Sequence, residues 1–363
     1  MLQAADMSQV VVGMSGGVDS SVAAWLLKSQ GYDVLAVFMV NWEDGVNPEG
    51  YRGEVASGCQ WEQDYADVRQ VCQKLDIPYT TFNFVEEYRK QVFDMFLSEL
   101  KAGRTPNPDI LCNQEIKFNR FIQKALALPN VEAVATGHYA KTDGVKLLRP
   151  KDRNKDQTYF LHRIDAAVLP KVLFPLADLT KDEVREIARR EEFPNADKQD
   201  STGICFIGDI DYTAFVKQYM PALPGAIELQ DGTILGEHDG LHLYTIGQRR
   251  GIDIGGKGPY YVVRKDLDDN RLLVTNDEND PLLSQLNCRA DQIHRLMAGD
   301  FPERVETMVR YRQKPVSGTV IEQSDSNLLV KFDEPVRAVT PGQALAIYSG
   351  DQVLGGGIIS EAW

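Results

Sequence analysis

From residue 9 to residue 192 the chain alternates short apolar runs with longer segments of helical periodicity. Strands are expected over 9–12, 32–40, 79–84 and 133–136, and helices over 20–30, 64–75, 86–102, 113–126 and 180–192. The last helix has the clearest start, because Thr180 is followed three residues later by Glu183, the spacing of a capping box. Alternation of this kind predicts βαβ crossovers and therefore an α/β domain with a parallel, doubly wound sheet.

After about residue 210 glycines become frequent and helical periodicity ends. Runs at 260–264 and 271–275 predict strands of a small β-rich linking domain. Further on, evenly spaced runs separated by Gly, Pro and Asp turns predict a C-terminal antiparallel β-barrel, with strands at 306–311, 317–322, 327–332, 344–349 and 355–359. We therefore expect three domains, at 1–210, 211–287 and 288–363.

Charge gives a mixed indication about nucleic acid. The chain has 39 basic and 53 acidic residues and a net charge of −14, which disfavours non-specific binding to phosphate backbones. Two segments are locally basic: residues 141–163 hold seven Lys and Arg against three Asp, and residues 304–314 hold four against one Glu. Charge alone leaves two interpretations of these segments, solvated loops or local RNA-binding surfaces.

The compartment follows from apolar runs and cysteines. No apolar run approaches the roughly 20 residues of a membrane span, and the N-terminus lacks the pattern of a secretory signal, so no membrane partner is expected. Five cysteines at irregular spacing, without a CxxC pair, predict neither a disulfide framework nor a zinc site. These features favour a reducing compartment, most simply the cytoplasm.

The strongest local motif is GMSGGVDSS at residues 13–21, between the first expected strand and the first expected helix. Glycines allow several backbone N–H groups to converge on one anion, and the helix adds the positive end of its dipole. Ser15, Ser20 and Ser21 offer hydroxyl groups, and Asp19 either orients Mg²⁺ or caps the helix. The loop is neither a Walker A nor a GxGxxG motif. A plain tight turn is the alternative, but the position between strand and helix favours a phosphate site.

Two cysteines lie in unusual surroundings. In GRTPNPDILCNQEIKF (103–118) the prolines predict an extended loop up to Asp109, which places Cys112 near a helix start whose field favours the thiolate. Cys205 lies in the small-residue loop DSTGICFIG (200–208). Each cysteine alone is more often buried and inert than reactive. Beside the phosphate-type loop of residues 13–21, however, the two suit sulfur transfer, which needs a persulfide carrier and a second thiol. We expect Cys72 and Cys288 to be structural, and Cys59 has no comparable context.

The motif SGGVDS is the signature of the PP-loop ATP pyrophosphatases, which cleave ATP between the α- and β-phosphates and adenylate an oxygen. Six motifs in order, SGGVDSS, GRTPNPDILCNQEIKF, ATGHYA, STGICFIG, YTIGQRRG and RYRQKP, resemble the tRNA-specific 2-thiouridylase family of that superfamily. The resemblance spans nearly the whole chain. It implies a PP-loop α/β domain, a small β domain and a C-terminal barrel. It also implies ATP-dependent thiolation of the wobble uridine of tRNA, a disulfide bond, and a partner protein that donates persulfide sulfur.

Carried over residue by residue, the resemblance assigns roles to positions of this sequence. It implies Cys112 as the nucleophile, Cys205 as the persulfide carrier, and Asp109 as an acid/base group that contacts the target base together with Asn107 and Pro108. It implies ATP contacts by Gly13, Met14, Ser15, Gly16, Gly17, Val18, Asp19, Ser20, Met39 and Gly137, with Mg²⁺ entering with ATP. It implies tRNA contacts by His138, Lys155, Asp156, Gln157, Tyr311, Arg312 and Gln343.

Two rival functions stay open on the sequence. A PP-loop amidotransferase or ligase would use ammonia and would need neither Cys112 nor Cys205. A non-catalytic module would bind ATP without cleaving it. If the chain thiolates tRNA, two routes are also open. The Cys205 persulfide attacks C2 of the base directly, or Cys112 first displaces the outer sulfur of that persulfide as hydrosulfide.

Overall fold

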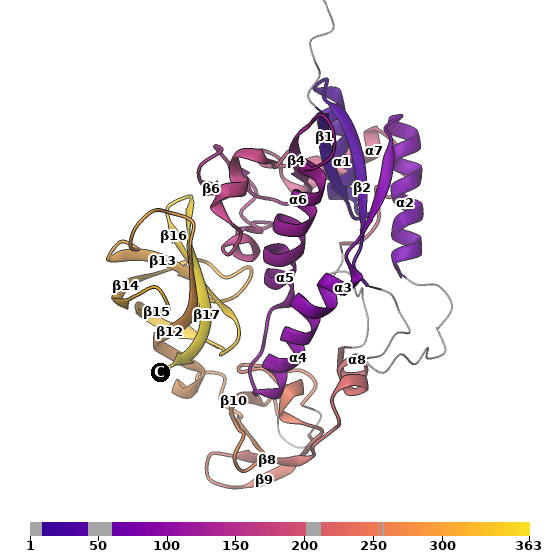
Figure 1. Ribbon diagram of the computed structural model, residues 1–363. Coiled ribbons are helices and arrows are strands. Elements are labelled where there is room, and N and C mark those ends of the chain that lie inside the picture. The colour runs from indigo at the N-terminus through magenta and orange to yellow at the C-terminus, as the bar shows by residue number, and fades with distance from the viewer. Residues whose placement is uncertain (1–8, 43–59, 201–211, 253, 256–257) are drawn as a thin grey trace, which may run out of the picture. The chain divides into compact units, whose positions relative to one another are not determined.

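The computed structural model describes residues 9–42, 60–200, 212–252, 254–255 and 258–363 (Figure 1). The chain divides into two compact units. The first contains residues 1–93, 108–209 and 351–353, and the second contains residues 94–107, 210–350 and 354–363.

The first unit is built on a five-stranded parallel sheet with the strand order β3-β2-β1-β4-β7. Its strands are β1 (Gln9–Met14), β2 (Asp33–Val40), β3 (Tyr79–Asn83), β4 (Val131–Thr136) and β7 (Val172–Leu173). The strand order reverses between β1 and β4, where Gly13 pairs with Thr136. Ligands of open α/β sheets bind outside the carboxyl ends of the strands at such a reversal. The sheet therefore places the 13–21 loop and the segment after Thr136 together at the position expected for a ligand.

Helices cover both faces of this sheet. The helical segments are α1 (Val18–Ser29), α2 (Gln60–Leu75), α3 (Val85–Tyr88), the π-helix η1 (Arg89–Phe93), α5 (Pro108–Leu111), the π-helix η2 (Cys112–Arg120), α6 (Phe121–Leu126), the 3₁₀ helices η3 (Thr158–Leu161) and η4 (Ala166–Lys171), and α7 (Lys181–Arg190). Val10 and Val12 of β1 share a core with α1, α2 and α7. Successive strand residues point to opposite faces, and Gly13 faces Phe121 of α6. Two short strands, β5 (Lys141–Thr142) and β6 (Leu147–Leu148), follow β4.

The second unit contains a four-stranded sheet and a closed barrel. The sheet has the order β10-β11-β8-β9, in which β8 and β11 pair in parallel; its strands are β8 (Gly225–Leu229), β9 (Ile234–His238), β10 (Tyr261–Asp266) and β11 (Arg271–Thr275). The barrel runs β12-β15-β14-β13-β16-β17, and pairing of β12 with β17 closes it. Its strands are β12 (Ser284–Arg295), β13 (Arg304–Met308), β14 (Val316–Gln323), β15 (Asn327–Arg337), β16 (Ala344–Ser349) and β17 (Gln352–Ala362). The unit also includes α4 (Asp94–Lys101), α8 (Tyr212–Tyr219), η5 (Leu241–Leu243) and η6 (Pro281–Leu283).

The predicted fold class is confirmed: a parallel α/β domain is followed by β-rich structure and a C-terminal barrel. Three local predictions differ from the structure. The helix carrying Cys112 begins at Pro108, because proline is tolerated at the first helical position, where no intrahelical N–H bond is lost. The segment 309–311 is not part of a strand, since β13 ends at Met308 and Tyr311 lies in a turn. The expected helix over 86–102 is interrupted by the π-helix η1.

Candidate active site

The loop between β1 and α1 is held by its own serines. The Ser20 hydroxyl donates to the Gly17 carbonyl over 3.0 Å and accepts from the Ser15 N–H over 3.2 Å. The Ser21 hydroxyl also donates to the Gly17 carbonyl, over 3.0 Å. Helix α1 begins at Val18, so Gly17 is its N-cap and has no side chain to bond the N–H groups of the first turn. These donors and the helix dipole together suit an anionic ligand.

Two glycines of this region have no room for a side chain. Gly16 has φ +78°, and a Cβ added there would lie 2.5 Å from the Asp64 carbonyl oxygen. A Cβ on Gly137 would lie 2.7 Å from the Ser20 backbone nitrogen. The segment after β4 therefore rests directly on the first turn of α1, as the strand reversal predicts.

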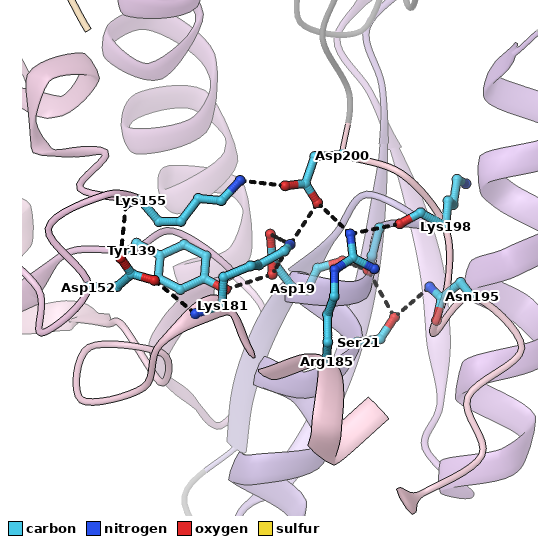
Figure 2. Close-up of polar contacts among 12 residues, drawn as sticks. Asp19, Ser21, Tyr139, Asp152, Lys155, Lys181, Arg185, Asn195, Lys198 and Asp200 are labelled. Carbon is cyan, nitrogen blue, oxygen red and sulfur yellow. Dashed lines mark hydrogen bonds and ion pairs between the residues drawn. The ribbon is translucent and has the colours of Figure 1, made fainter. Parts of the chain in front are cut away.

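Side chains from the segment after α7 form hydrogen bonds with the loop between β1 and α1 (Figure 2). The Asn195 amide donates to the Gly16 carbonyl and to the Ser21 hydroxyl, each over 2.9 Å. Lys198 donates to the same Gly16 carbonyl over 3.3 Å and forms a 2.7 Å ion pair with Asp64. Sequence reasoning missed both residues, because neither belongs to a recognisable motif.

Asp19 is the second residue of α1 and does not cap it, so the capping alternative is wrong. Its carboxylate accepts hydrogen bonds from the Lys181 ammonium over 2.7 and 2.8 Å and from the Tyr139 hydroxyl over 2.9 Å. The Lys181 ammonium also lies 2.7 Å from a carboxylate oxygen of Asp200. Lys181 is therefore shared by two carboxylates at the start of α1 (Figure 2).

Asp200 has two further cationic partners. Lys155 donates to it over 2.6 Å, and Arg185 does so over 3.2 Å. Burial alone would raise the pKa of Asp200, but the hydrogen bonds from Lys155 and Lys181 outweigh it and lower the pKa to about 2. Asp200 is thus ionised at physiological pH. Together with Asp19 it forms a cluster of two carboxylates and three cationic side chains, those of Lys155, Lys181 and Arg185.

Lys181 is positioned by a well-defined helix start. The capping box between Thr180 and Glu183, expected from the sequence, is present at the start of α7. The backbone N–H of Lys181 also donates to Asp152 over 2.9 Å. Both sets of bonds fix the position of the Lys181 backbone, from which its side chain extends to Asp19.

The remaining ATP-assigned residues lie around the carboxyl end of β1. Met14 and Val18 are buried at the two ends of the loop. Met39 is buried near the end of β2, and its Cε lies 3.5 Å from where a Cβ on Gly13 would be.

Residues 108–126 form consecutive helical segments that bring Asp109 and Cys112 into the same unit as the loop. Phe121 lies against Gly13, with its ring 3.2 Å from the position of a Cβ there. The Phe118 ring lies 5.4 Å from the His138 imidazole. Cys112 is fully buried, at 0% exposure, and Asp109 is partly buried. Cys112 is thus the fifth residue from Pro108, farther from the helix start than its predicted position.

His138 follows Gly137 and is partly exposed. Its Nδ1 lies 2.9 Å from the Thr136 hydroxyl. Burial, with a smaller contribution from the positive charge of Lys117, lowers the pKa of His138 well below its usual value. The imidazole is therefore neutral at physiological pH, so it can act as a hydrogen-bonding group but not as a cation toward RNA.

The segment Lys155-Asp156-Gln157, assigned to tRNA by resemblance, makes internal contacts in this structure. Asp156 is 4% exposed and accepts a 2.6 Å hydrogen bond from Arg149. Gln157 accepts from the Tyr139 N–H over 2.9 Å. Together with the Lys155–Asp200 bond, these contacts connect the segment to the ion-pair cluster beside α1.

The buried Arg149–Asp156 pair leads to a stability prediction. Replacing Asp156 with alanine leaves the Arg149 guanidinium, whose side chain is 12% exposed, without this carboxylate, and it also removes two hydrogen bonds that Asp156 accepts from Thr158. We therefore expect the free energy of unfolding to fall by about 3 kcal/mol. Chemical denaturation measures this change. The matched control is Asp178→Ala, which breaks the exposed Lys141–Asp178 pair and should cost less than about 1 kcal/mol. Equal effects of the two substitutions would show that the Asp156 pair does not support the fold.

In the second unit, Gln343 holds the loop that contains Asn107. Its amide donates to the Thr105 carbonyl over 2.8 Å, and the Thr105 N–H donates to the Pro341 carbonyl over 2.9 Å. Tyr311 and Arg312 lie in the turn between β13 and β14, with Arg312 exposed, at φ +62°, and over the Tyr311 ring at 5.3 Å. An exposed arginine beside an aromatic ring suits contact with phosphate and base.

The cysteines divide as follows. Cys205 and Cys59 lie outside the described residues. Burial raises the pKa of the Cys72 thiol to about 12 and also raises that of Cys288, which agrees with the expected structural roles. In the described part of the chain, Cys72, Cys112 and Cys288 form no disulfide.

The carboxylates fit a divalent cation that arrives with a nucleotide. Within the described residues no group of three or more His, Cys, Asp and Glu side chains is arranged to hold a metal. Mg²⁺, however, usually takes one or two carboxylates and completes its shell with water and substrate phosphates. Asp19 and Asp200 are two carboxylates that face one position, because the Lys181 ammonium lies 2.7 Å from each of them and is the cation that pairs with both in this structure.

Comparison with known proteins identifies the family. Residues 8–209 match the family model described as a tRNA methyl transferase HUP domain, residues 213–276 match its PRC-barrel domain, and residues 286–359 match an aminomethyltransferase β-barrel domain. A tRNA-specific 2-thiouridylase of Geobacillus kaustophilus is 51% identical over 97% of this chain and 95% of its own. One from Bacillus subtilis is 48% identical over 98% and 96%. The chain belongs to the tRNA-specific 2-thiouridylase family. The predicted family is therefore confirmed, and full-length relatives carry the thiouridylase name although the first domain model carries a methyltransferase description.

Among solved structures, a 4-thiouridine synthetase in complex with RNA and ATP covers 58% of this chain and 49% of its own. Its identity is 16% and its TM-score 0.34, too low a likeness to support any argument about this thiouridylase-family chain. Within the described residues, no helix has the length and apolar character needed to cross a membrane.

Proposed function

We propose that this chain is a tRNA-uridine 2-sulfurtransferase, which uses ATP to convert the wobble uridine of tRNA to 2-thiouridine. The observation that carries the proposal is the attachment of the cysteine helix to the phosphate-type loop. Phe121 packs on Gly13, and Phe118 lies beside His138, so the helical segments with Asp109 and Cys112 contact both strand ends that form the loop site. An activating site and a nucleophile thus belong to one unit.

The first half-reaction activates the base. ATP binds with its phosphates on the loop, and the C2 oxygen of the uridine attacks the α-phosphorus. The bond to the β-phosphate oxygen breaks, and pyrophosphate leaves. The resulting adenylate converts a poor leaving oxygen into AMP. Mg²⁺ held by Asp19 and Asp200 would neutralise the phosphate charge, as divalent cations do in phosphoryl transfer.

The second half-reaction delivers sulfur. A donor protein loads a persulfide on Cys205. In one route the outer sulfur of this persulfide attacks C2 directly, and in the other Cys112 first displaces that sulfur as hydrosulfide, which then attacks C2. In both routes Cys112 attacks the inner sulfur of Cys205, a Cys112–Cys205 disulfide forms, and AMP leaves from C2. The two thiol groups supply the electrons that reduce the persulfide sulfur, and an external thiol reductant restores them.

For tRNA we propose direct contacts by His138, Tyr311, Arg312 and the Asn107-Pro108-Asp109 segment. The internal bonds of Lys155, Asp156, Gln157 and Gln343 support a further proposal, that these four residues position the ATP cluster and the base-binding loop. We also propose the domain boundaries at 210/211 and 287/288. The family-model ranges 8–209 and 213–276 support the first, whereas the barrel model already begins at residue 286. Five cysteines at irregular spacing are typical of a protein in a reducing compartment, which supports a cytoplasmic location.

The products of ATP cleavage test this function. With tRNA and sodium sulfide we expect AMP and pyrophosphate in equal amounts, each dependent on tRNA. Formation of ADP and phosphate, or cleavage that ammonia supports and sulfide does not, would instead favour another PP-loop enzyme. Tight ATP binding without cleavage in the presence of tRNA would favour the non-catalytic module.

The exposed turn at Arg312 gives a prediction about salt. If Arg312 contacts a phosphate, Arg312→Ala should reduce the slope of log affinity for tRNA against log salt concentration by about 0.7–0.9. Titrations at three salt concentrations measure the slope. Arg304 is the matched control, because it lies in the same barrel but is paired with Asp333. An unchanged slope for Arg312→Ala, or an equal change for Arg304→Ala, would place the RNA elsewhere.

A further inference from the structure

The YTIGQRRG motif at residues 244–251 takes no part in the two proposed half-reactions. Hydrogen bonds hold the backbone of this loop. The Gln248 amide accepts from the Thr245 N–H over 2.9 Å and donates to the Arg250 carbonyl over 2.8 Å. The Gln248 carbonyl accepts from the Val262 N–H of β10 over 3.0 Å. The two arginines of the motif therefore extend from a backbone that is bonded both within the loop and to β10.

The arginine side chains of this loop, those of Arg249 and Arg250, are exposed. Of the residues that the structure describes, none forms an ion pair or a hydrogen bond with either guanidinium group. Two other exposed arginines of the same unit, Arg264 and Arg304, are by contrast paired with carboxylates. In a chain with a net charge of −14, two adjacent arginines without such a pair form a local surface that suits an anionic partner.

The loop lies beside the segment that leads to Asn107. The Thr245 hydroxyl lies 3.5 Å from the Thr105 hydroxyl, and the Thr105 carbonyl accepts from the Gln343 amide over 2.8 Å. Thr105 precedes Asn107 by two residues, and all of these residues belong to the second unit. The arginine loop and the start of the proposed base-binding segment are thus neighbours within one unit.

The RNA backbone is the anion that fits this arrangement. A uridine bound by the Asn107-Pro108-Asp109 segment brings its 5′- and 3′-phosphates with it, because both are attached to the same nucleotide. An arginine guanidinium binds a phosphate through two parallel hydrogen bonds. Contacts of this kind fix the position of the strand without reading its sequence.

We propose that Arg249 and Arg250 bind the backbone phosphates next to the target uridine and hold the RNA strand in position while the base is activated. The proposal rests on the proposed function and adds to it a phosphate-binding surface on the 244–251 loop. The two arginines act on the RNA backbone, so ATP binding does not depend on them.

Salt titrations of tRNA binding to the full-length protein test the proposal. Replacing both residues, Arg249→Gln with Arg250→Gln, should weaken tRNA binding about tenfold or more. It should also reduce the slope of log affinity against log salt concentration by about 1.4–1.8, since each phosphate contact contributes roughly 0.7–0.9. ATP affinity, measured by calorimetry, should stay unchanged. Replacing both with lysine keeps the charge but loses the bidentate geometry, so we expect a smaller loss of affinity with an unchanged slope.

Ethylation interference locates the phosphates along the tRNA. Ethylation of a phosphate next to the wobble uridine should weaken binding to the wild-type protein and should have little effect on the double glutamine variant. The matched control replaces Arg264 and Arg304 with glutamine, which removes the same charge from two arginines that are paired with carboxylates. This control should leave the salt slope unchanged.

Three results would contradict these expectations. An unchanged slope in the double glutamine variant, or an equal change in the control, would overturn the proposal. Interference that the variant loses only at phosphates far from the wobble uridine would overturn it as well. Wild-type protein that binds no tRNA would contradict the proposed function itself, so the two failures are distinguishable.

Discussion

Gly137→Ala is expected to weaken ATP binding about tenfold to a hundredfold while the fold is kept. The added methyl would lie 2.7 Å from the Ser20 nitrogen and 3.0 Å from the Asp19 carbonyl carbon. Both are backbone atoms, so relief of the overlap must push the segment after β4 away from the first turn of α1. Overpacking of this kind commonly costs about 1–3 kcal/mol, and here the displaced atoms form the anion site itself. Calorimetry measures the affinity, and circular dichroism reports the fold.

The control for Gly137→Ala is Gly255→Ala, because a Cβ at Gly255 would meet no described atom within 4 Å. It should leave ATP affinity unchanged. Wild-type affinity in Gly137→Ala would mean that the nucleotide does not bind at the junction of α1 and the end of β4. The strand reversal between β1 and β4 would then not be the ATP site.

The cysteine variants are expected to separate into two classes. Cys112→Ser and Cys205→Ser should each reduce thiolation to background, because one removes the thiol that opens the persulfide and the other removes its carrier. Cys72→Ser and Cys288→Ser should retain activity, although each replaces a buried thiol with a hydroxyl and should lower stability. Quantification of 2-thiouridine in tRNA after incubation with ATP and a persulfide donor measures all four.

A second readout separates the roles of the two reactive cysteines. Both serine variants should still form AMP and pyrophosphate in the presence of tRNA if adenylation precedes sulfur transfer. Thiolation at the wild-type rate in Cys205→Ser would remove the persulfide assignment. Loss of adenylation in Cys112→Ser would instead mean that this buried thiol is needed to assemble the nucleotide site.

The sequence predicts the parts of the fold whose signals are local. The parallel sheet follows from β-branched runs alternating with helices, and α7 follows from the Thr180–Glu183 capping box. Two signals misled. The prolines before Asp109 predict an extended loop up to that residue, whereas Pro108 is the first residue of a helix. Strands β8 and β9 carry only weak apolar alternation, so the sequence does not predict them. Their pairing specifies them instead, since β8 pairs with β11 and β9 pairs with β8.

The candidate site shows the same division. The glycines and serines of the 13–21 loop form one contiguous motif, so the sequence alone identifies them. The ion-pair cluster is assembled from Asp19, Lys181 and Asp200, which are far apart in the chain and carry no local pattern. The inward contacts of Asp156 and Gln343 are likewise products of tertiary packing. Only the folded chain shows that these two groups bond to protein.

The most direct test of the account is mass spectrometry of a wobble-uridine tRNA incubated with the purified protein, ATP, Mg²⁺ and a persulfide donor. The proposed sulfurtransferase activity predicts exchange of one oxygen for one sulfur, located by nuclease digestion at the wobble uridine and dependent on ATP. A modified uridine at another position, a methyl group in place of sulfur, or sulfur incorporation without ATP would contradict it.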